Sequence, residues 1–524
     1  MDFSANNLSK AGVLGTLLLS FFFWTASVQA LDLIEAVREQ DSAAVRSLIA
    51  EGSDPNIAQA DGATALHWAV HRENAELVAL LLEAGADINA TNRMGASPLF
   101  IAARSGHTEL IEQLLVAGAN PNLQLTMGET PLMSAARAGS ALGVSLLIEE
   151  GADVNVQEAS REQSALMWAA SQGHVEVARV LIEAGADVNA ISKVRPMLMF
   201  VDATNGGAFD KGQMENLGGF TPLLFAARNG HTDLARELLS AGADIDLAAG
   251  NGTSPLVIAA HSGHGDLAIM LLEEGANPDA AAAGYNALHA AILRGDIAVV
   301  DALLAHGADP DARVERATPV QRASEDWVLK TPTVGATSYW LAASFREAEI
   351  MKLLADNGAD PMRTNLEQYR RHRERAQREN PPPPEVIGGF VSTLQAAIRG
   401  DSTRQRYYVQ ANPDPVGEER KALESAIVAL DHGVNIDHTD FTDSTALHDA
   451  ATRNLATVVR ELAERGANLN ALNGRGQTAL DLAIAAERRL GMGILAQETP
   501  EYVGPTARQI LEGLGALESG ELSN

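Results

Sequence analysis

Cysteine is absent from the chain, and aromatic residues fill only 4% of its 524 positions. The absence of cysteine excludes disulfide bonds, thiolate metal sites, a cysteine nucleophile and a lipidated N-terminal cysteine. Alanine, leucine and glycine are abundant, a composition that favours closely packed helices over a β-rich core. The composition therefore predicts a mainly helical protein.

Basic residues are also scarce. The chain has 39 lysines and arginines against 68 aspartates and glutamates, which gives a formal net charge of -29. Such an acidic chain repels phosphate backbones, so nucleic acid is not an expected partner. A nucleophile elbow, a glycine-rich phosphate loop, a His-Glu-x-x-His helix and an EF-hand loop are all missing from the sequence. We therefore predict a protein that is not an enzyme and needs no cofactor.

The first thirty residues resemble a secretory signal. An apolar run at 11–24 (AGVLGTLLLSFFFW) follows Lys10, and the sequence Val-Gln-Ala at 28–30 suits signal cleavage. The run is shorter than the about 20 residues that a helix needs to span a bilayer. We predict a signal peptide over 1–30, no stable membrane span after cleavage, and a periplasmic or secreted location. An uncleaved N-terminal anchor is the alternative.

A short motif that starts with threonine, serine or asparagine recurs along the chain. Its first steps are 33, 33 and 34 residues, and the starting residues are Thr64, Ser97, Thr130, Ser164, Thr221, Ser254, Asn286, Thr337, Ser392, Thr445 and Thr478. A glycine lies 21 residues after nine of them: Gly85, Gly118, Gly151, Gly185, Gly242, Gly275, Gly307, Gly358 and Gly466. A fixed internal length with variable spacing indicates a tandem repeat that carries insertions.

Each repeat predicts a pair of helices. The starting threonine or serine can cap a helix, and a proline often follows it, where the missing N–H is not needed. A Gly-His pair, such as Gly106-His107, ends this first helix. A second helix with apolar residues at helical spacing follows, for example at 108–117, and ends at a glycine suited to the left-handed conformation.

This pattern resembles the ankyrin repeat. The Thr-Pro-Leu-His motif of that family appears here as TALH at 64–67 and TPLM at 130–133, and its Gly-Ala-Asp-Val-Asn-Ala stands at 185–190. The resemblance extends over about 31–516. It implies an all-α solenoid of about twelve helix-turn-helix units with projecting hairpin loops. It also implies a monomeric, non-enzymatic scaffold that binds a protein partner, most similar to bacterial exported ankyrin proteins with long hairpin insertions.

The histidine of TALH, His67, is predicted to be structural rather than catalytic. The same position of other repeats holds His289, His448, Phe100, Met133, Met167, Leu224, Val257, Trp340, Gln395 and Asp481. A position that accepts such different side chains is typical of packing. Trp68 and Trp168, one position further along, are likewise expected to pack between repeats.

Four insertions interrupt the repeat, near 191–219, 313–334, 361–389 and 402–420. The first three fall where an ankyrin repeat projects its hairpin, and the fourth falls between the two helices of one unit. Because motif sequence resumes directly on both sides, we expect one continuous solenoid over 31–516. We expect a flexible tail over 517–524.

The hairpin insertions are predicted to carry binding residues, because they place apolar and basic side chains on an acidic scaffold. These residues are Phe200 and Phe209 in the first insertion, Trp327 in the second, and Arg370, Arg371 and Arg373 in the third. The segment 369–379 (YRRHRERAQRE) is either a solvated helix or a basic contact arm. A second candidate surface is a stripe at the ends of the first helices, with Arg104, Arg137 and Arg228.

The most metal-like cluster is DHGVNIDHTDFTD at 431–443. Histidine and carboxylate ligands suit zinc or manganese, but no recognised ligand spacing is present. We therefore predict no metal site. An insertion-built metal or enzymatic site on the ankyrin scaffold is the alternative function.

The signal prediction can be checked directly. N-terminal sequencing of the mature protein should give a chain that begins with the residue after Ala30. A mature chain that begins at Met1 would instead support the uncleaved anchor.

Overall fold

The computed structural model describes residues 33–200, 212–316, 318, 329, 333–365, 368–370, 385–388, 390–400, 414–491 and 504–522. The predicted signal peptide lies outside these residues. The chain divides into unit 1, which comprises Met1–Lys193 and Gly218–Asp244, and unit 2, which comprises Val194–Leu217 and Ile245–Asn524. The described parts are helical apart from two small two-stranded sheets, so the predicted all-α class is confirmed.

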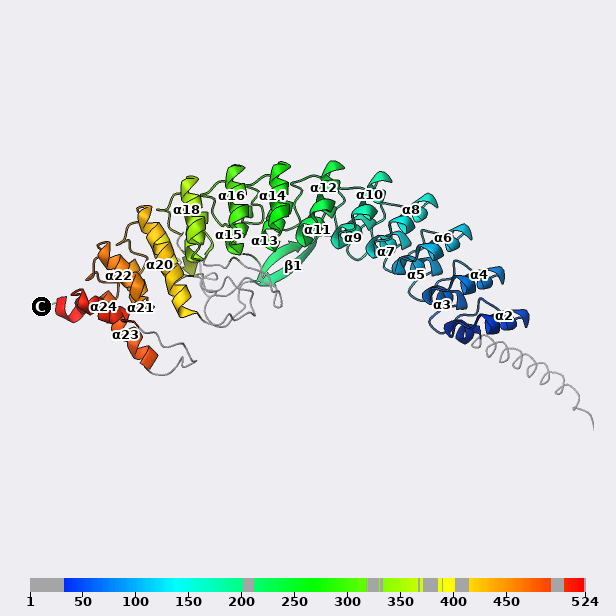
Figure 1. Ribbon diagram of the computed structural model, residues 1–524, viewed down its shortest axis with the longest axis horizontal. Helices are drawn as coiled ribbons and strands as arrows, with labels where there is room; N and C mark the ends of the chain where they lie inside the picture. The colour runs from blue at the N-terminus through cyan, green and yellow to red at the C-terminus, as the bar shows by residue number, and fades with distance from the viewer. Residues whose placement is uncertain are drawn as a thin grey trace, which may run out of the picture. The chain divides into compact units, whose positions relative to one another are not determined.

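Unit 1 contains six pairs of helices (Figure 1). The first member of each pair, the inner helix, packs on inner helices of the next and previous pairs, and the outer helices pack likewise. The inner helices are residues 33–38, α3 (Ala65–His71), α5 (Pro98–Ser105), α7 (Pro131–Ala138), α9 (Ala165–Gln172) and α11 (Pro222–Asn229). The outer helices are α2 (Ser42–Ala50), α4 (Ala75–Glu83), α6 (Thr108–Val116), α8 (Ala141–Glu149), α10 (Val175–Glu183) and α12 (Thr232–Ser240).

Unit 2 also contains six pairs, so the described residues hold the twelve pairs that the repeat predicted. Its inner helices are α13 (Pro255–Ser262), α15 (Ala287–Arg294), α17 (Ser338–Ser344), α19 (Thr393–Arg399), α21 (Ala446–Thr452) and α23 (Ala479–Gly491). Its outer helices are α14 (Gly265–Glu273), α16 (Ile297–Ala305), α18 (Ala348–Asp356), α20 (Pro415–Asp431), α22 (Ala456–Glu464) and α24 (Ala507–Gly513). The remaining elements are β1 (Arg195–Phe200), β2 (Gly212–Leu217), β3 (Gln368–Arg370), β4 (Glu385–Gly388) and α25 (Ser519–Leu522).

The helix ends follow from local sequence. Ser97 precedes α5, and its hydroxyl accepts the N–H of Phe100 at 3.2 Å, while Pro98 occupies the first turn. The helix stops at Gly106, whose φ of 69° lies in the left-handed region that glycine tolerates best. His107 then caps α6 by accepting the N–H of Leu110. The predicted Gly-His boundary is therefore confirmed.

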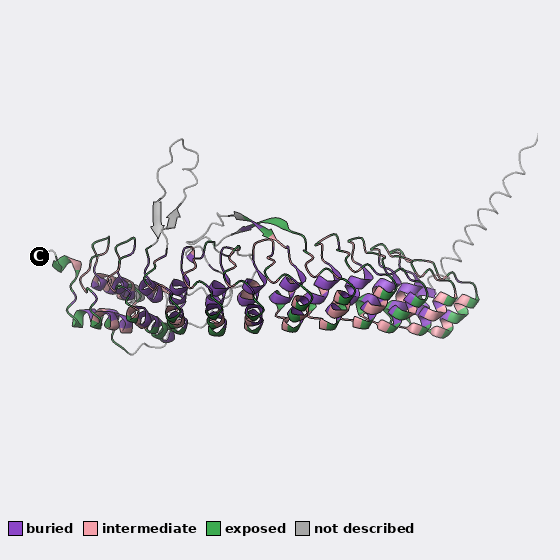
Figure 2. Cartoon of the chain, turned by 90° about the horizontal axis from the view of Figure 1, so that it is seen from above, coloured by how far each residue is buried: buried purple, intermediate pink, exposed green. Residues whose placement is uncertain are grey.

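The core is built largely from small and aliphatic side chains. Ala102 and Ala103 of α5 and Ala169 and Ala170 of α9 are fully buried, which lets neighbouring helices approach closely. Leucines such as Leu99 fill the space between the rows. Figure 2 shows the buried residues along the packed helices and much more exposure on the β1–β2 hairpin.

Asparagine side chains join consecutive hairpins of unit 1. Oδ1 of Asn155 accepts the N–H of Asp187 at 2.8 Å, and its Nδ2 donates to the carbonyl of Gly185 at 3.0 Å. Asn56 and Asn122 make the same two bonds in their repeats. Each of these amides therefore satisfies one donor and one acceptor of the next repeat.

Each hairpin insertion is closed at its base by hydrogen bonds. The N–H of Ser192 donates to the carbonyl of Phe220 at 3.0 Å across the first insertion. The N–H of Val314 donates to the carbonyl of Ala336 at 3.0 Å across the second. In the third, buried Asn365 accepts the N–H of Val391 at 2.9 Å. These bonds restore the ordinary hairpin end, so the repeat can resume after each insertion.

The first and third insertions form β-hairpins. In the first, β1 pairs antiparallel with β2, from Arg195 with Leu217 to Phe200 with Gly212. In the third, β3 pairs with β4, so the helical interpretation of 369–379 is wrong at its start. The strand contains Tyr369, which pairs with Val386, and both residue types favour strands. The charge pattern of 369–379 could not reveal the pairing, because the partner strand β4 lies outside that segment.

The fourth insertion is partly helical. Helix α20 has 17 residues, whereas the outer helices of unit 1 have 9 each, so positions 415–420 belong to this helix. Buried Glu419 in the extension accepts both the N–H and the hydroxyl of Thr457, each at 2.7 Å. It thereby caps helix α22, whose own N-cap residue, Leu455, has no side chain able to do so.

The predicted flexible tail is tied at its start to the hairpin before α23 and to α23 itself. The N–H of Leu517 donates to Asn470 at 2.9 Å, and the N–H of Ser519 donates to Asp481 at 3.2 Å. The short helix α25 follows, and only 523–524 lie outside the described residues. These bonds were not foreseeable from the polar, glycine-containing end of the sequence.

The hairpin amides generate a stability prediction. Asp279 stands where unit 1 has asparagine and accepts the N–H of Asp309 at 2.9 Å, but an ionised carboxylate has no N–H to donate to a carbonyl. Asp279→Asn should restore the donor and raise the free energy of unfolding by about 0.5–1.5 kcal/mol. Thermal unfolding followed by circular dichroism measures the change.

Two further variants test the same hydrogen bonds in the opposite direction. Asp279→Ala removes the acceptor for Asp309 and should destabilise the chain, and Asn155→Asp should lose the donor and do the same. A lower unfolding midpoint for Asp279→Asn than for the parent would contradict the assignment.

Candidate functional site

His67 links two repeats through its ring. The backbone N–H of Thr64 donates to Nδ1 at 3.1 Å, so the ring proton lies on Nε2, which donates to the carbonyl of Ala96 at 3.0 Å. The ring is 2% exposed. Both nitrogens are therefore engaged by neighbouring backbone, which confirms the prediction that His67 is structural.

Other polar side chains at the same position make the same link. Nε2 of His289 donates to the carbonyl of Ala312 at 3.0 Å, and Nε1 of Trp340 donates to Val391 at 2.9 Å. Nε2 of Gln395 donates to the carbonyl of Ser444 at 2.7 Å, while its Oε1 accepts the N–H of Ser392 at 3.1 Å. Glutamine therefore reproduces both bonds of the histidine without a titratable group.

Burial sets the protonation of these histidines. It lowers the pKa of His289 to about 4, against opposing contributions from the carbonyl of Ala312 and from Asp309. Burial also lowers the pKa of His67. Because Nδ1 of both rings accepts a backbone N–H, the neutral form is the one that the fold stabilises.

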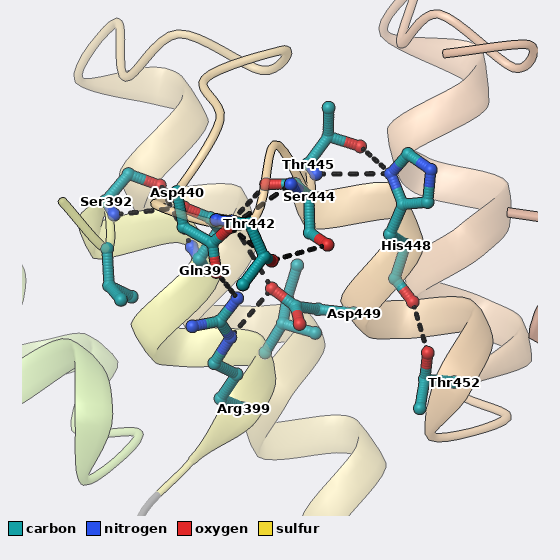
Figure 3. A network of polar contacts seen from close by, with 12 residues as sticks. Ser392, Gln395, Arg399, Asp440, Thr442, Ser444, Thr445, His448, Asp449 and Thr452 are labelled. Carbon is teal, nitrogen blue, oxygen red and sulfur yellow. Dashed lines mark hydrogen bonds and ion pairs between the residues drawn. The ribbon is translucent and has the colours of Figure 1, made fainter. Parts of the chain in front are cut away.

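A polar network in unit 2 surrounds Arg399 at the end of α19 (Figure 3). Its Nε contacts Oδ2 of Asp449 on α21 at 2.8 Å, and its Nη2 contacts Oδ2 of Asp440 at 2.7 Å. Burial alone would raise the pKa of Asp440, but hydrogen bonds from Arg399 and Thr442 outweigh it and lower that pKa. Burial raises the pKa of Asp449, against the charge of Arg399.

This network is a link between helices. Its guanidinium is shared by two carboxylates from the next repeat, and Asp440 also accepts the N–H groups of Thr442 and Ser444 at 2.8 and 3.1 Å. The arrangement fixes the hairpin at 440–444 against α19 and α21.

The residues of the metal-like segment 431–443 are engaged separately by protein groups. Asp431 pairs with Arg465 at 2.6 Å, and Asp437 accepts the N–H of Asn468 at 2.9 Å. Nε2 of His438 lies 2.7 Å from the carbonyl of Phe390. In the described part of the chain, no group of three histidine, aspartate or glutamate side chains is placed to hold a metal ion.

Comparison with known protein families agrees with this geometry. The model described as "Ankyrin repeats (3 copies)" matches residues 33–124, 105–192, 204–282 and 223–314, and so covers more than half of the chain. The chain belongs to the ankyrin-repeat family. A second model, "Ankyrin repeats (many copies)", matches residues 430–483. No curated protein sequence matches the chain.

The ankyrin-repeat models leave a gap between 314 and 430. The structure nevertheless has helix pairs α17 with α18 and α19 with α20 in this interval. Three of the four insertions fall wholly or partly inside it. Long insertions therefore hide repeats that the backbone geometry still shows.

In this ankyrin protein, the predicted arginine stripe lies at the ends of inner helices in unit 1. Arg104 ends α5 and is exposed. Arg137 of α7 lies 4.8 Å from the ring centroid of Trp168 on α9 and 3.4 Å from Glu129. Arg228 of α11 lies 5.9 Å from the ring of Phe220. Trp168 therefore packs between repeats, as predicted, and holds an arginine over its face.

The structure reaches only part of the predicted insertion site. Phe209, Trp327, Arg371 and Arg373 lie outside the described residues. Phe200 is the last residue of β1, and Arg370 is the last residue of β3.

Sequence reasoning missed the residues that join the insertions of unit 2. Glu215 on β2 of the first insertion is buried and lies 3.9 Å from Arg316 at the start of the second. Nη1 of Arg313 donates to the carbonyl of Thr364 at the start of the third at 3.2 Å. The contacts cross 101 and 51 positions of sequence, so no local pattern could indicate them.

The β1–β2 hairpin presents an apolar pair to solvent. Leu198 and Met214 face each other across the strands and are 53% and 62% exposed. Met199, the next residue along β1, points to the other face and is buried. The alternation in 195–200 opposite 212–217 was the signal that could have identified Met214.

The buried histidines predict acid sensitivity. Between about pH 6.5 and pH 4 the unfolded chain protonates His289 and the folded chain does not, so stability falls as the pH is lowered through this window. The shift corresponds to about 3 kcal/mol for this residue. His289→Gln should fold at neutral pH and lose less stability than the parent between pH 7 and pH 4.5.

Thermal unfolding at the two pH values measures this difference. His71→Gln is the matched control, because it makes the same substitution at an exposed histidine. An equal loss of stability in parent and His289→Gln would show that another group controls the acid response.

Proposed function

We propose that this ankyrin-repeat protein is an exported, non-enzymatic scaffold that binds another protein through the hairpin insertions of unit 2. The observation that carries the proposal is the exposed pair Leu198 and Met214 on a hairpin that the repeat itself does not need. Two adjacent exposed apolar side chains on a projecting element offer a partner anchors that can be desolvated on binding.

Contacts between insertions support a shared surface. The Glu215–Arg316 pair connects the first insertion to the second, and the bond from Arg313 to Thr364 connects the second to the third. Phe390, at the end of the third insertion, is a further exposed apolar side chain, and the next residue, Val391, is buried. A surface assembled from three linked insertions can present several apolar anchors at once.

Export rests on the N-terminal sequence. The apolar run at 11–24 and the Val-Gln-Ala at 28–30 support cleavage by a signal peptidase, and the lack of cysteine makes the fold independent of thiol chemistry. In the part of the chain that the structure describes, no helix combines the length and apolarity required to cross a membrane. A periplasmic or secreted monomer is the proposed form.

The apolar pair gives the most direct test of insertion binding. A partner is first captured on the immobilised mature protein from periplasmic extract and identified by mass spectrometry. Its affinity is then measured for the double variant Leu198→Ser with Met214→Ser. Both side chains are exposed, so the fold should be retained while affinity falls by about tenfold or more.

The chain offers a matched control. Met94 and Met127 are 62% and 54% exposed on hairpins of unit 1, and Met94→Ser with Met127→Ser removes a similar apolar area. Full affinity of the control together with reduced affinity of the first variant supports the proposal. Full affinity of the Leu198 and Met214 variant, with an unchanged circular dichroism spectrum, contradicts it.

A further inference from the structure

Five of the six inner helices of unit 1 lack acidic side chains, and the first, residues 33–38, contains Glu35. Helices α3, α5, α7, α9 and α11, all fully described, contain no aspartate or glutamate. Each of the outer helices α4, α6, α8, α10 and α12 contains at least one. In a chain with 68 acidic and 39 basic residues, this separation leaves the inner row the less negative side of unit 1.

Arginines occupy the ends of these inner helices. Arg72 follows α3, Arg104 belongs to the last turn of α5, Arg137 to that of α7 and Arg228 to that of α11. Arg72 thus extends the predicted stripe of Arg104, Arg137 and Arg228, and the arginine stripe means these four residues from here on. Helix α9, between Arg137 and Arg228, has Ser171 at the corresponding position.

Two members of the stripe retain unused hydrogen-bonding capacity. Arg72 and Arg104 are exposed, and within the described ranges neither guanidinium has a hydrogen bond or an ion pair. Arg137 and Arg228 are held over aromatic rings at 4.8 and 5.9 Å, which orients them without neutralising their charge. Arg137 also has a carboxylate partner, Glu129 at 3.4 Å.

We infer that the arginine stripe binds an acidic polypeptide segment, through carboxylates that pair with its exposed guanidinium groups. This inference rests on the proposed function, because it specifies the chemistry of a protein partner. Arginine matches carboxylates by presenting parallel N–H donors in a planar fork. The outer helices α4, α6, α8, α10 and α12 carry acidic residues. A thin acidic segment that stays on the inner row keeps its carboxylates away from them better than a bulky polyanion does.

The geometry also sets the spacing of the carboxylates. Packed helices lie about 8–10 Å apart, and an extended chain advances about 3.3 Å per residue. Acidic residues at every third position would therefore meet successive arginines. Because α9 offers Ser171 instead of arginine, the matching segment has glutamates at positions 1, 4, 7 and 13.

Fluorescence anisotropy with synthetic peptides tests the inference on the full mature chain in about 0.15 M salt, where the Debye length is about 8 Å. The probe is a labelled 13-residue peptide of serine and alanine with glutamates at those four positions. The comparison peptide has the same composition with its four glutamates adjacent. The spaced peptide should bind more tightly than the clustered one.

Two double variants distinguish binding by the arginine stripe from a general effect of positive charge on peptide affinity. Arg72→Gln with Arg104→Gln removes the two exposed cations and should weaken binding of the spaced peptide by about tenfold. Arg46→Gln with Arg179→Gln removes two positive charges from outer helices of the same unit and should change it little. Equal losses in both variants, equal affinity for both peptides, or no binding overturns the inference.

Two further measurements complete the test. A 12-nucleotide single-stranded DNA that displaces the spaced peptide at lower concentration than the unlabelled peptide would assign the stripe to nucleic acid and overturn the inference. The Leu198→Ser with Met214→Ser variant should bind the spaced peptide like the parent. If peptide binding depends on the stripe but binding of the captured partner is unchanged in the Leu198 and Met214 variant, only the proposed insertion surface is contradicted. If binding of the captured partner depends on Leu198 and Met214 but peptide binding does not depend on the stripe, only the stripe inference is contradicted.

Discussion

A hydrogen bond from an inner helix to the next hairpin joins neighbouring repeats wherever the inner helix has histidine, tryptophan or glutamine at one position. A side chain at one position of the inner helix donates to a backbone carbonyl of the following hairpin, as His67 does to Ala96 and Gln395 does to Ser444. A buried carbonyl must be satisfied, so a helix pair that lost this donor would leave an unpaired acceptor in its interface. Histidine, tryptophan and glutamine all serve, because the requirement is one N–H at one place.

Backbone closure of the hairpins explains why the chain tolerates long insertions. The hairpin ends at Ser192 and Phe220, and at Val314 and Ala336, are closed by backbone hydrogen bonds before the inserted residues project away. Each repeat depends mainly on its immediate neighbours, so added length at a hairpin costs only loop entropy, which grows slowly with length. The insertions can then form contacts of their own, such as Glu215 with Arg316, without disturbing the helices.

Charged side chains are distributed differently over the inner and outer helices of unit 1. Carboxylates stand on outer helices of unit 1 while arginines end its inner helices, and unit 2 neutralises Arg399 internally with Asp440 and Asp449. The arginine at the end of an inner helix therefore joins two repeats in unit 2, where it is Arg399, and is accessible to solvent in unit 1. Apolar side chains are exposed at several places along the chain, and on the β1–β2 hairpin Leu198 and Met214 are placed by strand pairing rather than by the repeat.

The sequence by itself determined the helix pairs, their caps and their number, because each depends on residues close together in the chain. Ser97, Pro98 and Gly106 specify one helix between them, and the same signals recur in most repeats. It also placed the arginine stripe, since periodic positions align on successive helices. Only the tertiary structure decided that Glu419 caps α22, that Tyr369 lies in a strand, and that Glu215 meets Arg316. These contacts join residues far apart in sequence inside or beside insertions, where no repeat period relates the partners and each pairing is set by how the chain folds back on itself.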